Sequence, residues 1–167
     1  SNFSRTMSEI EMENFKLINL NNFIENFKNN YIGNSKNINL QFSLQKNNLK
    51  ILVNEDKLFQ VLINLIENSI SMAKSNSTIL IKSIKKNNEY GCLKIYDQGP
   101  GIPIAYKDKI FTRFYSDRKE FKDKHSGLGL SISREIINSF NGSIKLTKSD
   151  ESNFRGACFL IKLPLRK

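Results

Sequence analysis

Several short stretches of the chain alternate between hydrophobic and polar residues, which is the pattern of half-buried β-strands. The alternation is strictest over residues 38–44, and the turn residues Asn47 and Asn48 separate it from an apolar stretch over 49–53. A polar hairpin over 85–90 joins two further strands, and a second hairpin closes the chain. In addition to 38–44 and 49–53, strands are predicted over 15–20, 78–84, 91–96, 143–147 and 157–163.

Hydrophobic residues at helical spacing predict three principal helices. The most apolar one runs from Asn54 to about Ala73, and its start carries acidic residues that suit the helix dipole. The others are expected from Asn21 or Asn22 to about Tyr31, and from Ser126 or Gly127 to about Phe140, with a short helix over 104–111. Strands mixed with helices in this way favour an α/β architecture, with helices packed on one face of a mixed sheet.

Composition places the chain among single globular domains. Its 167 residues contain 39% hydrophobic residues and no long apolar run. Residues 1–14 are predicted to be the remnant of an upstream helix or linker, and 15–167 the domain of a fragment. The net charge of +10 comes from dispersed lysines without interleaved aromatic residues, so no nucleic-acid partner is expected. Cys92 and Cys158 lie in apolar strands and are expected to be reduced core thiols.

Two glycine-rich motifs carry the candidate chemistry. Residues 94–103 predict a buried strand that ends in Asp97 and continues into a turn in which the backbone can approach a ligand closely. Residues 125–132 predict a glycine-rich loop that leads into a helix, an arrangement that offers backbone N–H groups to phosphate. The polar segment 115–126 between them is predicted to form a lid over that ligand.

These motifs resemble a known superfamily. Asp97-x-Gly99-x-Gly101-Ile102 and Gly127-Leu128-Gly129-Leu130 are similar to the G1 and G2 boxes of the GHKL ATP-binding proteins. Residues 110–115 resemble the F box of sensor histidine kinases, residues 56–69 resemble their N box, and residues 156–164 resemble their last strand. The resemblance covers 15–164 and implies the Bergerat-type fold, an α/β two-layer sandwich with a mixed five-stranded sheet and about three helices on one face.

The resemblance also implies roles for individual residues. Asn68 would coordinate the Mg²⁺ that bridges the phosphates of ATP, and Asp97 would accept a hydrogen bond from the adenine amine. Glu67 and Asn64 are the candidate catalytic residues. The expected nucleotide contacts are Asn68, Asp97, Gly99, Gly101, Ile102, Arg113, Arg118, Lys124, Gly127, Leu128, Gly129 and Leu130.

Each role has a structural alternative. Asp97 also fits an aspartate that opens a turn before Gly99, and Glu67 fits a solvated helix carboxylate. Both Asn64 and Asn68 fit surface positions in an asparagine-rich chain. The sequence does not choose among the cations Arg113, Arg118 and Lys124 for the γ-phosphate.

Two features depart from the family pattern. Ser71 stands where many members carry a basic residue, which shifts phosphate contacts toward the lid cations or Lys74. Lys124 and His125 stand where the lid often has glycines, and an exposed loop histidine is the simplest interpretation of His125.

The sequence therefore predicts the catalytic domain of a two-component sensor histidine kinase. Its phosphoacceptor histidine would lie on a separate dimerisation domain, because His125 lacks the helical context of an acceptor. A response regulator is the expected downstream partner. The parent protein is expected to be a membrane-bound homodimer with this domain in the cytoplasm, and the fragment is expected to be a monomer.

Three alternatives stay open from the sequence. The first is another GHKL ATPase or serine kinase, which the absence of a glutamate at position 64 and the phenylalanine-rich segment disfavour. The second is a degenerate ATP-binding domain without catalysis. The third is a basic interaction module.

Overall fold

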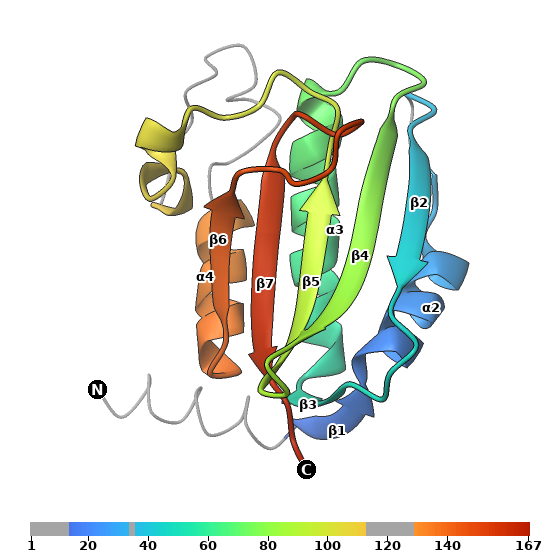
Figure 1. Ribbon diagram of the computed structural model, residues 1–167, viewed down its shortest axis with the longest axis vertical. Coiled ribbons are helices and arrows are strands. Elements are labelled where there is room, and N and C mark those ends of the chain that lie inside the picture. Colours follow the sequence, from blue (N-terminus) through green and yellow to red (C-terminus); the bar gives the residue numbers. More distant parts are fainter. Residues whose placement is uncertain (1–13, 34–35, 113–128) are drawn as a thin grey trace.

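A five-stranded sheet forms one layer of the protein. The computed structural model describes residues 14–33, 36–112 and 129–167 (Figure 1). The sheet has the strand order β2-β4-β5-β7-β6, in which β2 and β4 are parallel and the other pairs are antiparallel. The strands are β2 (Asn39–Leu44), β4 (Thr78–Lys86), β5 (Tyr90–Tyr96), β6 (Ser143–Thr147) and β7 (Cys158–Pro164).

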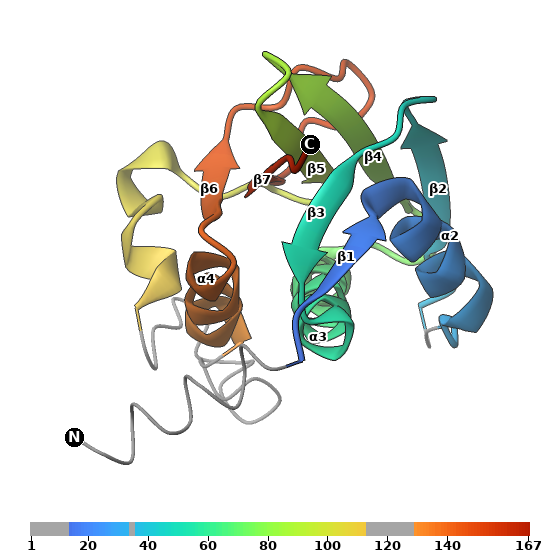
Figure 2. The ribbon, with the colours of Figure 1, turned by 90° about the horizontal axis from the view of Figure 1, so that it is seen from below.

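Three helices form the second layer, on one face of this sheet (Figures 1 and 2). They are α2 (Leu20–Asn30), α3 (Glu55–Met72) and α4 (Gly129–Ser139). The hydrophobic core lies between the layers and contains the apolar face of α3, including Leu58, Leu62 and Ile66, together with the inward residues of the strands. The predicted two-layer fold with a mixed five-stranded sheet is confirmed.

The first predicted strand belongs to a separate small sheet. Strand β1 (Lys16–Asn19) pairs antiparallel with β3 (Lys50–Val53), and neither joins the main sheet. Helix α2 starts earlier than predicted because Asn19 caps it: the Oδ1 atom of Asn19 accepts a hydrogen bond from the backbone N–H of Asn21 at 2.9 Å. The ring of Phe15 lies edge-on to that of Phe140 at 5.3 Å.

The connection after β5 also differs from the prediction. Instead of one short helix over 104–111, the chain makes two single 3₁₀ turns, η1 (Ile104–Tyr106) and η2 (Lys109–Phe111). The second turn is held by apolar contacts. Phe111 is buried edge-on to Phe159 at 6.2 Å, and the guanidinium of Arg134 lies 5.3 Å from the centre of the Phe111 ring.

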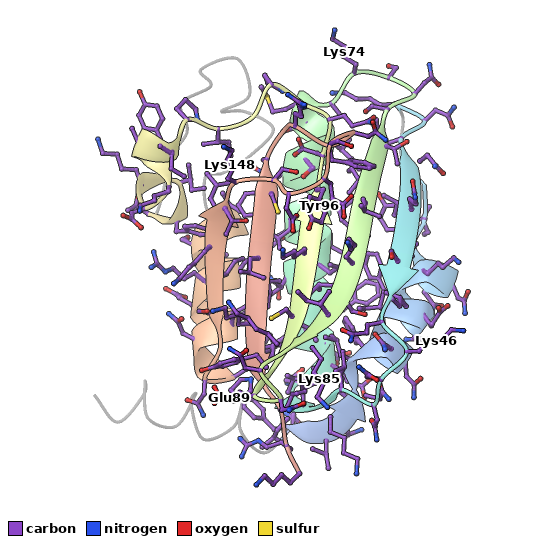
Figure 3. All side chains as sticks on the ribbon, in the orientation of Figure 1. Lys46, Lys74, Lys85, Glu89, Tyr96 and Lys148 are labelled. Atoms are coloured by element: carbon purple, nitrogen blue, oxygen red, sulfur yellow. The ribbon has the colours of Figure 1, made fainter. Side chains whose placement is uncertain are left out.

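Among the described residues, a small apolar cluster lies on the opposite face of the sheet, formed by Leu80, Tyr96, Phe154 and Cys158. Both cysteines are free and buried, as predicted, and burial raises the pKa of each thiol. The labelled lysines are dispersed over the molecule: Lys46 and Lys85 lie toward one end and Lys74 at the other (Figure 3). Among the described helices, none has the length and apolarity that a membrane crossing requires.

The predicted remnant over 1–14 lies almost entirely outside the described residues, so the predicted domain boundary stays a prediction.

Candidate nucleotide site

Asp97 follows the last residue of the central strand β5 and is 4% exposed. Its Oδ1 atom accepts hydrogen bonds from the backbone N–H groups of Gly99 (3.0 Å) and Ala157 (2.9 Å). The first of these bonds is the aspartate turn that the structural alternative predicts. The second comes from the other end of the sequence and anchors the carboxylate to β7. The aspartate turn therefore exists, and the buried carboxylate also binds the backbone N–H of Ala157.

Gly156 is a part of this site that the sequence analysis did not assign. Its backbone N–H donates to the carbonyl oxygen of Asp97 at 3.1 Å. A Cβ at this position would lie 2.0 Å from the Oδ1 atom of Asp97 and 2.6 Å from the backbone nitrogen of Gly99. The close approach leaves room for glycine alone. The signal in the sequence was the start of the last-strand motif at Gly156, but its contact with Asp97 has no sequence signature.

A narrow pocket brings together four of the predicted site residues, Asn68, Asp97, Gly101 and Ile102. Asn68 and Met72 line it from α3, one helical turn apart, while Gly101 and Ile102 line it from the turn after β5. Gly101 has a φ of +81°, a conformation that L side chains rarely adopt. The predicted motifs therefore do bring Asn68 and Asp97 to the same pocket. The remaining lining residues are Met72, Pro100 and Ala157.

Asn64 lies one turn before Asn68 and contacts α4. Its Nδ2 atom donates to the carbonyl oxygen of Gly129 and to the Oγ atom of Ser133, both at 3.3 Å. The Oγ atom of Ser133, which is fully buried, also donates to the Gly129 carbonyl oxygen at 2.8 Å. Asn64 therefore joins α3 to the first described turn of α4, the helix that follows the second glycine motif.

Glu67 lies on another side of α3. It is exposed and lines a groove with Tyr31, Ile63 and Ile70, between the end of α2 and α3. This groove and the pocket around Asp97 share no lining residue. The exposure of Glu67 fits the solvated helix carboxylate, and its catalytic role stays a prediction.

The end of α3 is held by a lysine from the loop between α2 and β2. The Nζ atom of Lys36 donates to the carbonyl oxygens of Ile70 (2.8 Å), Ser71 (3.2 Å) and Ala73 (3.0 Å). These are carbonyl groups at the end of a helix that has no basic residue in its last turn. The Lys36 ammonium therefore caps the helix that carries Asn68, and the Oγ atom of Ser71 donates back to the Asn68 carbonyl oxygen at 2.7 Å.

Several predicted contacts lie outside the described residues, namely Arg113, Arg118, Lys124, Gly127 and Leu128, together with His125. Gly129 and Leu130 begin the described part of α4, where Leu130 packs against the main core.

Comparison with known proteins identifies the class to which this fold and site belong. Residues 53–167 match the family described as histidine kinase-, DNA gyrase B- and HSP90-like ATPases. The chain belongs to this family, and its relatives within the family are sensor histidine kinases.

The sensor protein kinase WalK of Staphylococcus aureus is 32% identical over 84% of this chain and 35% of its own length. The sensor protein ChvG of Rhizobium meliloti is 34% identical over 66% of this chain and 20% of its own length. The chain therefore spans about a third or less of these relatives.

Solved structures show the same likeness. The nucleotide-free catalytic domain of the histidine kinase ThkA is 30% identical, with a TM-score of 0.71, over 90% of this chain and 97% of that domain. The mycobacterial sensor histidine kinase MprB has a TM-score of 0.76 over 90% of this chain and 97% of the other, at 20% identity, which shows the fold alone. The predicted family is confirmed, and the chain is an ATP-binding catalytic domain of the sensor histidine kinase type.

Proposed function

We propose that this domain binds Mg·ATP in the pocket between α3 and the turn after β5, and supplies the γ-phosphoryl group to a histidine on a separate dimerisation domain. The observation that carries the proposal is the buried carboxylate of Asp97 in the same pocket as the Asn68 amide. A buried carboxylate requires hydrogen-bond donors. The exocyclic amine of adenine is such a donor, and the backbone bonds to Oδ1 fix the carboxylate that would receive it.

Asn68 is the proposed protein ligand of Mg²⁺. An amide oxygen is a suitable ligand for this hard cation, which usually keeps several waters and binds substrate phosphates with few protein groups. The described residues contain no cluster of three histidine, cysteine or carboxylate side chains that could hold a metal ion. Mg²⁺ would supply charge neutralisation at the phosphates, while α3 and its Lys36 cap orient Asn68.

The remaining residues are proposed to position the nucleotide. Gly99 and Gly101 allow the turn to approach the base, and Asn64 fixes the start of α4. The backbone of Gly127 and Gly129 would approach the phosphates, with one of Arg113, Arg118 and Lys124 reaching the γ-phosphate.

The partners follow from the relatives. ThkA has been solved in complex with the response regulator TrrA, and we infer that a response regulator also acts downstream of this domain. The dimerisation domain would belong to the same parent protein, which we propose to be a membrane-bound homodimer with this domain in the cytoplasm.

The proposal is tested by calorimetric titration with a non-hydrolysable ATP analogue, with and without Mg²⁺. Asp97→Asn keeps an Oδ1 acceptor for both backbone N–H groups and removes the charge, so the fold is expected to persist while affinity falls at least about tenfold. Asp56→Asn, at an exposed carboxylate in the first turn of α3, is the matched control and should bind as the wild type does. Wild-type affinity in Asp97→Asn would refute the adenine role.

Phosphotransfer is tested separately, with radiolabelled ATP and a purified dimerisation domain of a sensor histidine kinase. Label is expected on that domain and not on this chain. Stable label on His125 would overturn the separate acceptor, and nucleotide binding without transfer would indicate a degenerate domain.

A further inference from the structure

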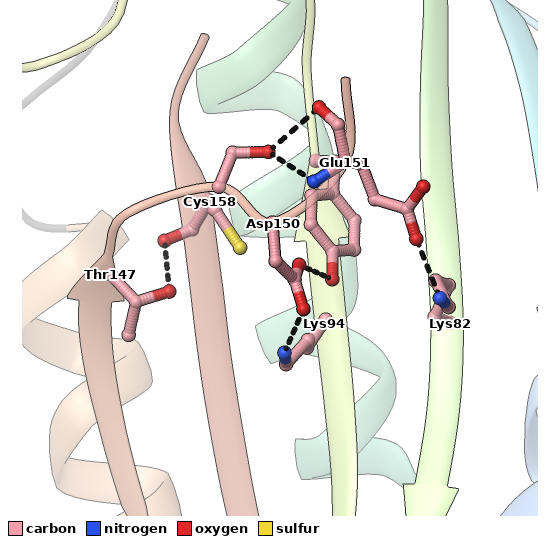
Figure 4. A network of polar contacts seen from close by, with 8 residues as sticks. Lys82, Lys94, Thr147, Asp150, Glu151 and Cys158 are labelled. Carbon is pink, nitrogen blue, oxygen red and sulfur yellow. Dashed lines mark hydrogen bonds and ion pairs between the residues drawn. The ribbon is translucent and has the colours of Figure 1, made fainter. Parts of the chain in front are cut away.

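The loop between β6 and β7, residues 148–157, is fastened to the sheet face that the helices leave uncovered. It crosses the end of β5 (Figure 1), and charged side chains hold its first half (Figure 4). The hydroxyl of Tyr96 donates to the Oδ1 atom of Asp150 at 2.6 Å, and the Nζ atom of Lys94 lies 3.1 Å from the Oδ2 atom of Asp150. Beside them, Lys82 pairs with Glu151 at 2.6 Å.

The second half of the same loop holds Asp97. The backbone N–H groups of Gly156 and Ala157 donate to the carbonyl oxygen and the Oδ1 atom of Asp97, respectively. Tyr96 is the last residue of β5 and Asp97 follows it, so two consecutive residues bind the two ends of a single loop. The tyrosine hydroxyl fixes the start of the loop, and the buried carboxylate fixes its end.

The middle of the loop is also attached to the end of β5 and to the residue after next, Gln98. Phe154 is buried beside the Tyr96 ring, with centroids 6.4 Å apart, and its backbone N–H donates to the carbonyl oxygen of Glu151 at 3.0 Å. The Nε2 atom of Gln98 donates to the carbonyl oxygen of Asn153 at 3.1 Å. Residues 150–157 therefore form one packed unit.

The surroundings of Tyr96 and Asp150 keep the tyrosine hydroxyl protonated and the aspartate carboxyl ionised. Burial, followed by the bond to Asp150, raises the pKa of the Tyr96 hydroxyl well above its ordinary value. The hydrogen bond from Tyr96 lowers the pKa of the Asp150 carboxyl, to which Lys94 also contributes. At neutral pH the hydroxyl is thus a donor and the carboxylate an acceptor.

We propose that Tyr96, acting through Asp150, is a positioning residue for adenine recognition in this domain. By fixing the loop, it sets the position of the Ala157 N–H and thereby the orientation of the Asp97 carboxylate toward the base. The inference rests on the proposed nucleotide role of Asp97. It assigns a function to the uncovered sheet face, whose side chains do not reach the pocket themselves.

The test compares Tyr96→Phe with Tyr90→Phe. Tyr90 is the matched control because it begins the same strand and, six residues away, faces the same side of the sheet. Two nucleotides are titrated against each variant in the presence of Mg²⁺: ATP, and the purine riboside triphosphate that lacks only the exocyclic amine. Their affinity ratio isolates the contribution of the amine.

We expect the wild type to prefer ATP by at least about tenfold, as a buried hydrogen bond to a carboxylate predicts. Tyr96→Phe should reduce that preference by at least about threefold and leave affinity for the analogue nearly unchanged, because one hydrogen bond to a charged group is lost. Tyr90→Phe should keep the full preference. Asp150→Ala, which removes the acceptor of the Tyr96 hydroxyl, should behave as Tyr96→Phe does.

An equal loss of affinity for both nucleotides in Tyr96→Phe would show a merely structural role and overturn the inference, as would an unchanged preference. A wild type without preference for the amine would instead contradict the proposed role of Asp97. Thermal melts of each variant establish that the titrated protein is folded.

Discussion

The two walls of the proposed nucleotide pocket are held in different ways. The α3 wall presents Asn68 and Met72 from a long helix whose opposite side is buried in the main core. The loop wall presents Ala157, which is placed by a few directed hydrogen bonds and by the absence of a side chain at the neighbouring position 156. Apolar packing spreads its free energy over many contacts, whereas the loop wall depends on single atoms. The loop wall should therefore be the more sensitive to small changes.

The largest effect is expected from Gly156→Ala. The added methyl group would meet a buried carboxylate and backbone atoms, with its Cβ 2.0 Å from the Oδ1 atom of Asp97 and 2.8 Å from the Asp97 carbonyl oxygen. None of these groups can rotate away, so we expect about 3 kcal/mol of destabilisation and loss of nucleotide binding. Urea unfolding and calorimetric titration measure the two effects.

Gly33→Ala is the control, because a Cβ there has nothing within 4 Å. If Gly156→Ala binds nucleotide with wild-type affinity, the loop wall is more adaptable than its contacts indicate.

On the α3 wall, Lys36→Met should have the next largest effect. It keeps a long unbranched side chain and removes an ammonium that donates to the carbonyl oxygens of Ile70, Ser71 and Ala73. Because Lys36 is only partly buried, we expect a loss of about 1–2 kcal/mol of unfolding free energy. The comparison with Lys46→Met, at an exposed position, separates this effect from a general change of charge. Equal unfolding curves for the two variants would argue against the cap.

The difference between the walls also explains what the sequence could predict. The apolar face of α3, the alternation of the strands and the place of Asp97 after a buried strand are local patterns, and the structure contains each of them. Gly101 and Asn68 were likewise assigned by motif and lie in one pocket with Asp97. Local spacing and the order of the motifs were sufficient to predict these features.

Polar contacts between distant residues leave no such pattern. Lys36 lies 34 residues before Ile70, and Ala157 lies 60 residues after Asp97, so neither contact produces a periodic signal. The position of Glu67 was ambiguous for a similar reason. Its neighbour Asn68 lines the pocket, but one residue along a helix turns the side chain by about 100°, to the groove beside α2. The motif was sufficient to predict the helix, but it did not predict the role of each residue on it.

A smaller and opposite effect is expected at Ser69 of α3. Its side chain is 1% exposed, and its Oγ atom makes no hydrogen bond within the part of the chain that the structure describes. Since a buried hydroxyl without a partner is unfavourable, Ser69→Ala should raise the unfolding free energy by about 1 kcal/mol. Chemical denaturation measures this change, with Ser139→Ala at the exposed end of α4 as the control. A destabilised Ser69→Ala would indicate that the hydroxyl has a partner, such as a buried water.

The smallest effect should be the acid sensitivity of the loop wall. The folded protein lowers the pKa of Asp150 from its ordinary value of 3.8, chiefly through the hydrogen bond from Tyr96. The unfolded chain therefore binds this proton more readily, and the stabilisation is present above pH 3.8 and lost as the pH falls through the folded pKa. The Asp150 side chain is 61% exposed, so screening by solvent keeps the contribution small.

Melting temperatures of the wild type and Asp150→Asn should thus differ most near neutral pH and converge in acid. Tyr96→Phe removes the main cause of the lowered pKa of Asp150 while leaving Lys94 in place. As the pH falls, its melting temperature should therefore begin to approach that of Asp150→Asn at a higher pH than the melting temperature of the wild type does. Parallel profiles for all three proteins would show that Asp150 does not stabilise the loop through its charge. The anchor of the loop wall would then be the packing of Phe154 on Tyr96, and the two walls would depend on apolar contacts alike.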